Sequence, residues 1–164
     1  MIQFFSNNRK GYKKFEKGGI PSTDTPLIEI FNKPNLIFNY LYLTGFENLE
    51  GIDKNKLVAL VYELKLSEDD LRKLKVIDEY TVYHDGKEYV ILEEGEEYDE
   101  YVKDRIEEII EEAYNQIPEH LQYYFDEEKY KQDILIETSN GATLISDTYN
   151  EIKIGDKDYY VFYV

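Results

Sequence analysis

The chain reads Tyr80-Thr81-Val82-Tyr83-His84-Asp85-Gly86-Lys87-Glu88-Tyr89-Val90-Ile91-Leu92 near its middle, and this stretch predicts a β-hairpin. Two runs rich in β-branched and aromatic residues flank Asp85-Gly86, a dipeptide that accepts the positive φ angles of a two-residue hairpin turn. We therefore expect an antiparallel sheet to be built around residues 80–92.

Helical patterns lie on both sides of this hairpin. Before it, Asp53 is placed to cap a helix, and Ser67 with Asp70 gives a capping-box-like start to a shorter one. The first of these helices has an apolar stripe at Leu57, Leu60, Val61 and Leu64.

After the hairpin, a long helix is expected from about Tyr98 to Asn115, ending before Ile117-Pro118 because the residue before proline avoids helical angles. A short helix over 120–125 and a helix from Glu127 to about Ile134, capped by Asp126, should follow. The core face of the long helix is predicted to consist of Val102, Ile106, Ile109, Ile110 and Ala113.

Further strands are expected where apolar and β-branched residues gather between turn signals. The predicted strands are 27–31, 36–43, 143–145, 151–154 and 159–164. The fold class is therefore α+β: a mixed, mainly antiparallel sheet with an acidic long helix and two short helices packed on it. The last strand is apolar on both faces, so a sheet centre or a second copy must cover it, and we expect a homodimer.

Charge divides the chain unevenly. The 164 residues include 19 Lys plus Arg against 35 Asp plus Glu, a formal net charge of −16. Residues 1–24 hold five basic side chains against Glu16 and Asp24, and are expected to form a basic N-terminal arm. Residues 25–164 are expected to form the acidic domain, either as one unit or as two subdomains over about 25–92 and 93–164.

This composition excludes several classes of function. A strongly negative surface repels nucleic acid phosphates and anionic lipid, so we expect no direct nucleic acid binding and no membrane partner. No apolar run approaches the ~18 residues that a membrane span requires. The absence of cysteine removes disulfides and thiolate chemistry, which fits a reducing cytoplasm.

Catalytic patterns are nearly absent. His84 and His120 are the two histidines, and neither lies near a nucleophile motif or has zinc-site spacing. Asp53 followed by Glu63 and Lys65 matches the acid and Glu-x-Lys pattern of magnesium-dependent nucleases. In those nucleases the Glu-x-Lys lies on a strand, whereas here it lies on a predicted helix. We therefore expect a protein that is not an enzyme, with no catalytic residue, no metal and no cofactor.

Acidic side chains are concentrated in residues 93–112, where eleven carboxylates stand against Lys103 and Arg105. Many of them recur at steps of three and four, opposite the apolar face of the long helix. Like charges at this spacing cost up to about 0.5 kcal/mol per pair, so either a function favours the arrangement or it is the solvated face of an acidic protein. The candidate protein-binding surface consists of Glu93, Glu94, Glu96, Glu97, Asp99, Glu100, Asp104, Glu107, Glu108, Glu111, Glu112, Glu119, Asp126, Glu127, Glu128 and Asp133.

Residues 117–134 begin with Ile-Pro-Glu-His-Leu, contain Tyr-Phe-Asp at their centre and end with Asp-Ile. This segment resembles the C-terminal part of ArdA-like antirestriction proteins of phages and mobile elements. The resemblance is best over 98–136 and weaker over 36–64; residues 141–162 look like the tail of related small phage proteins. It implies an elongated, acidic, often dimeric protein that mimics DNA in the groove of type I restriction-modification enzymes, although the amino-terminal domain of that family is not recognisable and the basic arm departs from it.

The sequence thus predicts an inhibitor of a bacterial defence nuclease, of the antirestriction or anti-CRISPR type, acting in the cytoplasm of the bacterial host. Its carboxylates would occupy a basic DNA-binding channel of a restriction-modification enzyme or CRISPR effector. Two alternatives stay open: an inhibitor that binds outside the DNA channel through a tyrosine-rich surface, and a small acidic enzyme or ligand-binding module.

Overall fold

A computed structural model describes residues 22–164 of the chain. Most of the expected basic arm, residues 1–21, lies outside the described residues. Residues 22–25, which the structure describes, form a turn against the helix at residues 68–73, where the backbone N–H of Asp69 donates to the carbonyl of Thr23 at 3.0 Å.

The centre of the fold is a five-stranded sheet in the order β1-β2-β3-β5-β4, with every neighbouring pair antiparallel. The predicted hairpin is confirmed: β2 pairs with β3, and Asp85 and Gly86 take positive φ angles of 49° and 79°. The strands are β1 Lys75–Val76, β2 Thr81–His84, β3 Lys87–Glu93, β4 Tyr149–Ile154 and β5 Lys157–Tyr163.

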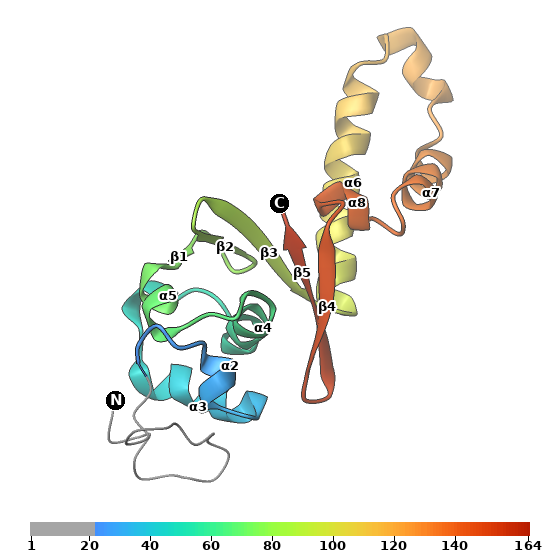
Figure 1. Ribbon diagram of the computed structural model, residues 1–164. Helices are drawn as coiled ribbons and strands as arrows, with labels where there is room; N and C mark the ends of the chain where they lie inside the picture. Colours follow the sequence, from blue (N-terminus) through green and yellow to red (C-terminus); the bar gives the residue numbers. More distant parts are fainter. Residues whose placement is uncertain (1–21) are drawn as a thin grey trace.

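β5 lies between β3 and β4, so a strand from the end of the chain is enclosed by the sheet (Figure 1). Helices of the same chain cover its two faces, and Val161 and Phe162 are fully buried. The apolar character of this strand is thereby accounted for without a second copy, and the homodimer stays a prediction with no support from β5.

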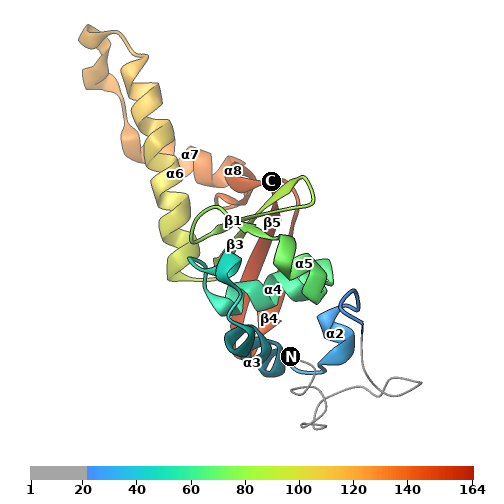
Figure 2. The ribbon, with the colours of Figure 1, turned by 90° about the vertical axis from the view of Figure 1, so that its left-hand side faces the viewer.

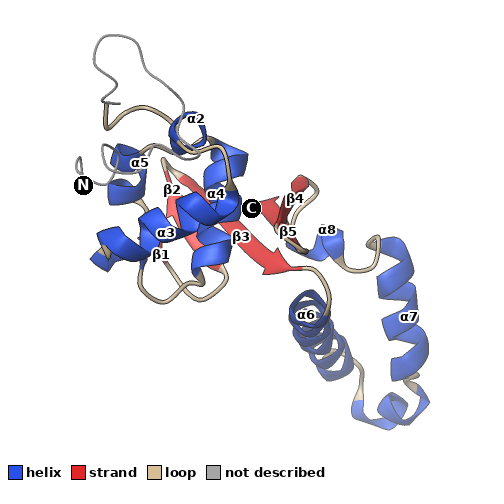
Figure 3. Ribbon diagram, turned by 90° about the horizontal axis from the view of Figure 1, so that it is seen from below, coloured by secondary structure: helices blue, strands red, loops and turns tan. Residues whose placement is uncertain are grey.

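One face of the sheet packs against the helices of the first half of the chain (Figure 3). The main contact is α4, whose Leu60 and Val61 are fully buried in one cluster with Ile91 and Val161 of the sheet. These helices are α2 Leu27–Ile30, α3 Pro34–Thr44, the 3-10 helix η1 Glu47–Leu49, α4 Lys54–Leu64 and α5 Glu68–Lys73.

The caps predicted for α4 and α5 are confirmed. The carboxylate of Asp53 accepts a hydrogen bond from the backbone of Asn55 at 2.7 Å. Ser67 and Asp70 form a complete capping box, in which each side chain accepts from the other residue's backbone N–H.

The opposite face of the sheet packs against two helices from the second half of the chain. Leu92 and Phe162 are buried there beside Ala142, with Tyr98 and Tyr101 packed around them. Leu92 and Phe162 belong to the sheet, Tyr98 and Tyr101 to α6 Glu96–Asn115, and Ala142 to α8 Ala142–Ile145. Strands β3 and β5 are therefore covered on both faces, which explains their continuous apolar sequence.

The far part of α6 leaves the sheet and projects away from it (Figures 1 and 2). The chain then turns through the 3-10 helix η2 Glu119–Tyr124 and returns along α7 Glu127–Glu137. We call residues 96–137 the helical hairpin. Of the predicted core face of α6, Val102 and Ile106 are buried, whereas Ile109, Ile110 and Ala113 are half-buried because they lie beyond the sheet.

Three predicted strands are wrong, since the segments 27–31, 36–43 and 143–145 are helical: they fall on α2, α3 and α8, and of their residues only Phe31 lies outside a helix. In α3, Pro34 occupies the first turn and Gly45 ends the helix with a φ of 56°, signals that outweigh the alternating pattern. The buried residues Ile37, Tyr40 and Leu41 have helical spacing, and Tyr42 is 68% exposed.

The other two wrong predictions concern single helical turns. α2 buries Leu27 and Ile30, three residues apart, and α8 follows the left-handed residue Gly141. The α+β class is confirmed, and the sheet is wholly antiparallel within residues 22–164.

Gly141 supports a prediction about how the hairpin is attached. A Cβ atom at this residue would lie 2.3 Å from Cγ1 of Val102 on α6, and the residue also has a φ of 90°. Gly155 has a comparable φ of 66° with no atom near its absent Cβ, so it is a matched control. We expect Gly141→Ala to lower the free energy of unfolding by about 1–3 kcal/mol more than Gly155→Ala does, as measured by urea denaturation. Equal losses would show that α6 does not approach Gly141 closely.

The tyrosines of β5 support a prediction about alkaline pH. Burial, followed by the charges of nearby carboxylates or a hydrogen bond to Glu63, raises the pKa of Tyr159, Tyr160 and Tyr163 from 10.0 to about 12. Between pH 10 and 12 the folded chain keeps these protons, whereas the unfolded chain loses them. The contribution of the three hydroxyls to the free energy of unfolding is therefore complete below pH 10 and is lost as the pH rises toward 12. The free energy of unfolding should fall across this window, and Tyr160→Phe should make the fall shallower. A slope that Tyr160→Phe leaves unchanged would contradict this assignment.

Candidate functional site

The outward face of α6 presents a row of exposed carboxylates, from Glu100, Asp104, Glu107 and Glu111. Steps of four, three and four residues place these side chains on the side of the helix opposite Val102 and Ile106, which are buried. The predicted row is therefore present at these four positions, and we call them the α6 acidic row.

Four of the eleven carboxylates in residues 93–112 have a basic partner, which lowers the charge they present. Two of these pairs are exposed and lie within α6, one joins β3 to β5, and one joins α6 to α4. The pairs are Lys157–Glu93 at 3.4 Å, Lys56–Glu97 at 2.7 Å, Lys103–Glu107 at 3.9 Å and Arg105–Glu108 at 3.0 Å.

Glu97 corrects the predicted arrangement because it faces the body of the protein and not the solvent. Its partner Lys56 lies on α4. The side chain of Glu97 is 27% exposed and that of Lys56 is 6% exposed. The Lys56 ammonium also donates to the carbonyl of Glu79 at 3.2 Å and lies 4.7 Å from the centre of the Tyr80 ring. This cluster fixes the first turn of α6 against α4 and the sheet.

The other predicted carboxylates divide between α6 and the returning part of the hairpin. Asp126 caps α7 by accepting from the backbone of Lys129 at 3.1 Å, so one of its functions is structural. The remaining exposed carboxylates are Glu94, Glu96, Asp99 and Glu112 at or near α6, and Glu119, Glu127, Glu128 and Asp133 on η2 and α7.

Three carboxylates come together at the base of the hairpin, from Glu94, Glu151 and Asp158. Their oxygen atoms lie within 4.8 Å of one another. Desolvation raises the pKa of Glu151, and a hydrogen bond with Glu94 and the charges of Glu94 and Asp158 raise it further. Carboxylate oxygens are ligands that Ca²⁺ accepts, but exposed carboxylates alone do not define a cation site, and we assign none.

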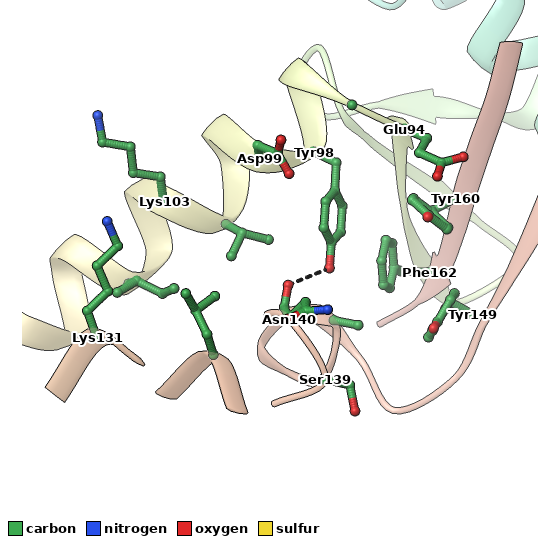
Figure 4. A pocket seen from close by; sticks show the side chains of 15 residues that line it. Glu94, Tyr98, Asp99, Lys103, Lys131, Ser139, Asn140, Tyr149, Tyr160 and Phe162 are labelled. Carbon is green, nitrogen blue, oxygen red and sulfur yellow. Dashed lines mark hydrogen bonds between the residues drawn. The ribbon is translucent and has the colours of Figure 1, made fainter. Parts of the chain in front are cut away.

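A cavity of about 790 Å³ lies between α6, the α7–α8 region and the sheet (Figure 4). Aromatic rings form one wall, where Tyr98 stacks on Phe162 with their centres 6.4 Å apart. The Tyr98 hydroxyl donates to the carbonyl of Asn140 at 2.9 Å. Figure 4 shows the ammonium groups of Lys103 and Lys131 at the opposite end from these rings, so the polar groups of the cavity do not converge on one point.

The residues of the nuclease-like pattern are separated in the fold. Asp53 caps the start of α4, while Glu63, near the end of that helix, accepts hydrogen bonds from Asn150 and Tyr163 of the sheet. Lys65 follows the helix as its left-handed cap residue. His84 lies 4.0 Å from Asp70, and His120 is exposed on η2.

The structure adds a feature whose position the sequence did not predict. Tyr123 and Tyr124, on the turn at the far end of the helical hairpin, are 91% and 78% exposed. The sequence predicted a short helix over residues 120–125 but not which of its side chains face the solvent, because that depends on the elements packed around the turn.

The chain matches no protein-family model, no curated protein and no solved structure. The resemblance to ArdA-like proteins therefore stays a prediction. Within the part of the chain that the structure describes, no helix is long and apolar enough to cross a membrane.

The Lys56–Glu97 pair supports a prediction about the attachment of α6. We expect Lys56→Met to lower the free energy of unfolding by about 3 kcal/mol, because it leaves the Glu97 carboxylate partly buried without its cation. Lys103→Met is the control, since its exposed pair with Glu107 contributes about 0.2–1 kcal/mol. In urea denaturation, Lys56→Met combined with Glu97→Gln should recover part of the loss. Equal effects of the two single variants would refute the assignment.

Proposed function

We propose that the protein inhibits a bacterial defence nuclease by presenting its helical hairpin as a mimic of DNA. The target is a restriction-modification enzyme or a CRISPR effector with a DNA channel lined by Lys and Arg. In this proposal a phage or mobile element encodes the protein, which acts in the cytoplasm of the bacterial host and needs no cofactor.

The observation that carries the proposal is the α6 acidic row on a projecting element. The row runs over eleven residue steps, which is about 16 Å at a rise of ~1.5 Å per residue. Its four carboxylates therefore follow one another every ~5 Å, the same order as the ~3.4 Å axial spacing of phosphates along one DNA strand. Glu119, Glu127, Glu128 and Asp133 extend the negative surface around the returning part of the hairpin.

Folding does not account for the row. Three of its members, Glu100, Asp104 and Glu111, form no ion pair within residues 22–164, and Glu107 has only a long, exposed contact with Lys103. Carboxylates that stabilise the fold are recognisable here by their partners, as Glu97 and Asp126 are. A row without such partners is available to a basic surface of another protein.

The shape of the molecule is compatible with insertion into a channel. The far half of α6 lies beyond the sheet and projects away from the supporting domain (Figures 1 and 2). The net charge of −16 would accelerate association with a positively charged channel and would make the rate sensitive to salt.

Charge reversal of the α6 acidic row tests the proposal. We expect Glu100→Lys, Asp104→Lys, Glu107→Lys and Glu111→Lys together to abolish inhibition of DNA cleavage by a purified type I restriction enzyme or Cas9-type effector that the wild-type chain inhibits. The affinity of the wild type should also fall steeply between about 50 and 200 mM salt, and duplex DNA should compete with it.

The matched control reverses four exposed carboxylates away from the hairpin: Glu29, Glu47, Glu50 and Asp156. Both variants gain the same positive charge. If only the α6 variant loses inhibition, the loss is due to the α6 acidic row and not to the change in net charge. Circular dichroism checks that both are folded. Inhibition by the α6 variant, or binding of the wild type to a nuclease already loaded with DNA, would favour the alternative contact outside the channel.

A further inference from the structure

We propose that Tyr123 and Tyr124 form an aromatic anchor that enters an apolar pocket of the target, at a place bordered by Lys and Arg side chains. This inference rests on the proposed function and deepens it, because it assigns the specific part of the contact to the tip of the helical hairpin. The α6 acidic row would then supply attraction, and the tip would select the partner.

The turn that holds the two tyrosines is fixed by ring packing and hydrogen bonds. Phe125 packs between Tyr114 and Tyr130, with ring centres 6.0 and 5.5 Å apart. The side-chain amide of Gln122 donates to the carbonyls of Tyr114 and Ile117 at 3.3 and 3.2 Å. The inward residues Gln122 and Phe125 flank the outward Tyr123 and Tyr124, so the turn fixes where the two rings point.

The two rings have the geometry of a single contact surface. Their centres are 5.6 Å apart, and their planes meet at 86° in an edge-to-face arrangement. Leu121, which is also exposed, belongs to the same turn. Tyrosine is common at the energetic centres of protein interfaces because it offers a large rigid ring with a polar end and loses little conformational entropy on binding.

The charge around the tip indicates the chemistry of the partner. Residues 119–128 contain four carboxylates, Glu119, Asp126, Glu127 and Glu128, and no Lys or Arg. A basic border on the partner would pair with these carboxylates, and an arginine would also be attracted to the face of a tyrosine ring. A second copy of this chain would bring like charges together at the tip, so the expected occupant is a different, basic protein.

The test uses a double variant that carries both Tyr123→Ser and Tyr124→Ser. Its affinity for the nuclease that the wild type inhibits is compared with that of the wild type. We expect the dissociation constant to rise at least about 30-fold, which corresponds to about 2 kcal/mol at 1.4 kcal/mol per tenfold change. The dependence of affinity on salt should stay that of the wild type, because the α6 acidic row is intact. Replacing both tyrosines by phenylalanine should restore most of the affinity.

Tyr42→Ser is the matched control, since Tyr42 is an exposed tyrosine on α3, outside the hairpin. Its affinity should equal that of the wild type. A serine double variant that binds like the wild type, or a control that loses as much affinity, overturns the anchor while the proposed function stands. A wild-type dimer that the double variant abolishes in sedimentation experiments overturns it in favour of self-association. If the wild type does not compete with DNA for any restriction-modification enzyme or CRISPR effector, the proposed function is wrong, and the anchor proposal is wrong with it.

Discussion

The antiparallel pairing of β3 with β5 joins Tyr89 to Tyr163 and Glu93 to Tyr159, and both halves of the molecule pack against it. On one face, Ile91 and Val161 meet the helices of the first half of the chain; on the other, Leu92 and Phe162 meet α6 and α8. Burial on both faces stabilises this pair more than any other part of the sheet. It also determines where α6 begins, because α6 starts shortly after β3 ends.

The carboxylates of the chain fall into two groups with different consequences for folding. Glu97 is partly buried and paired, and Asp126 caps a helix, so the fold depends on both. The α6 acidic row is exposed and weakly paired, and its mutual repulsion is a small cost to the helix. A residue of the first group would be a poor site for testing binding, since its replacement would change the fold as well.

Local signals in the sequence were sufficient for the elements that have caps or a defined turn. The Asp85-Gly86 turn, the Asp53, Ser67 and Asp126 caps and the apolar stripe of α4 all predicted their elements correctly. The wrong strands at α2, α3 and α8 contain short apolar runs, whose side chains suit a strand or a helix equally until tertiary contacts decide. Neither the inward direction of Glu97 nor the exposure of Tyr123 follows from spacing along one helix, because each depends on where the neighbouring elements lie.

Residues 94–148 leave the sheet after β3 and return to it at β4, and β5 lies between these two strands. The helical hairpin therefore lies within the connection between β3 and β4, two strands that both pair antiparallel with β5. Paired additions of whole helical turns to α6 and α7 would lengthen it by about 5.4 Å each without altering any strand. The reach of the hairpin can thus diverge between related chains, or be adjusted by engineering, while the supporting domain keeps its core unchanged.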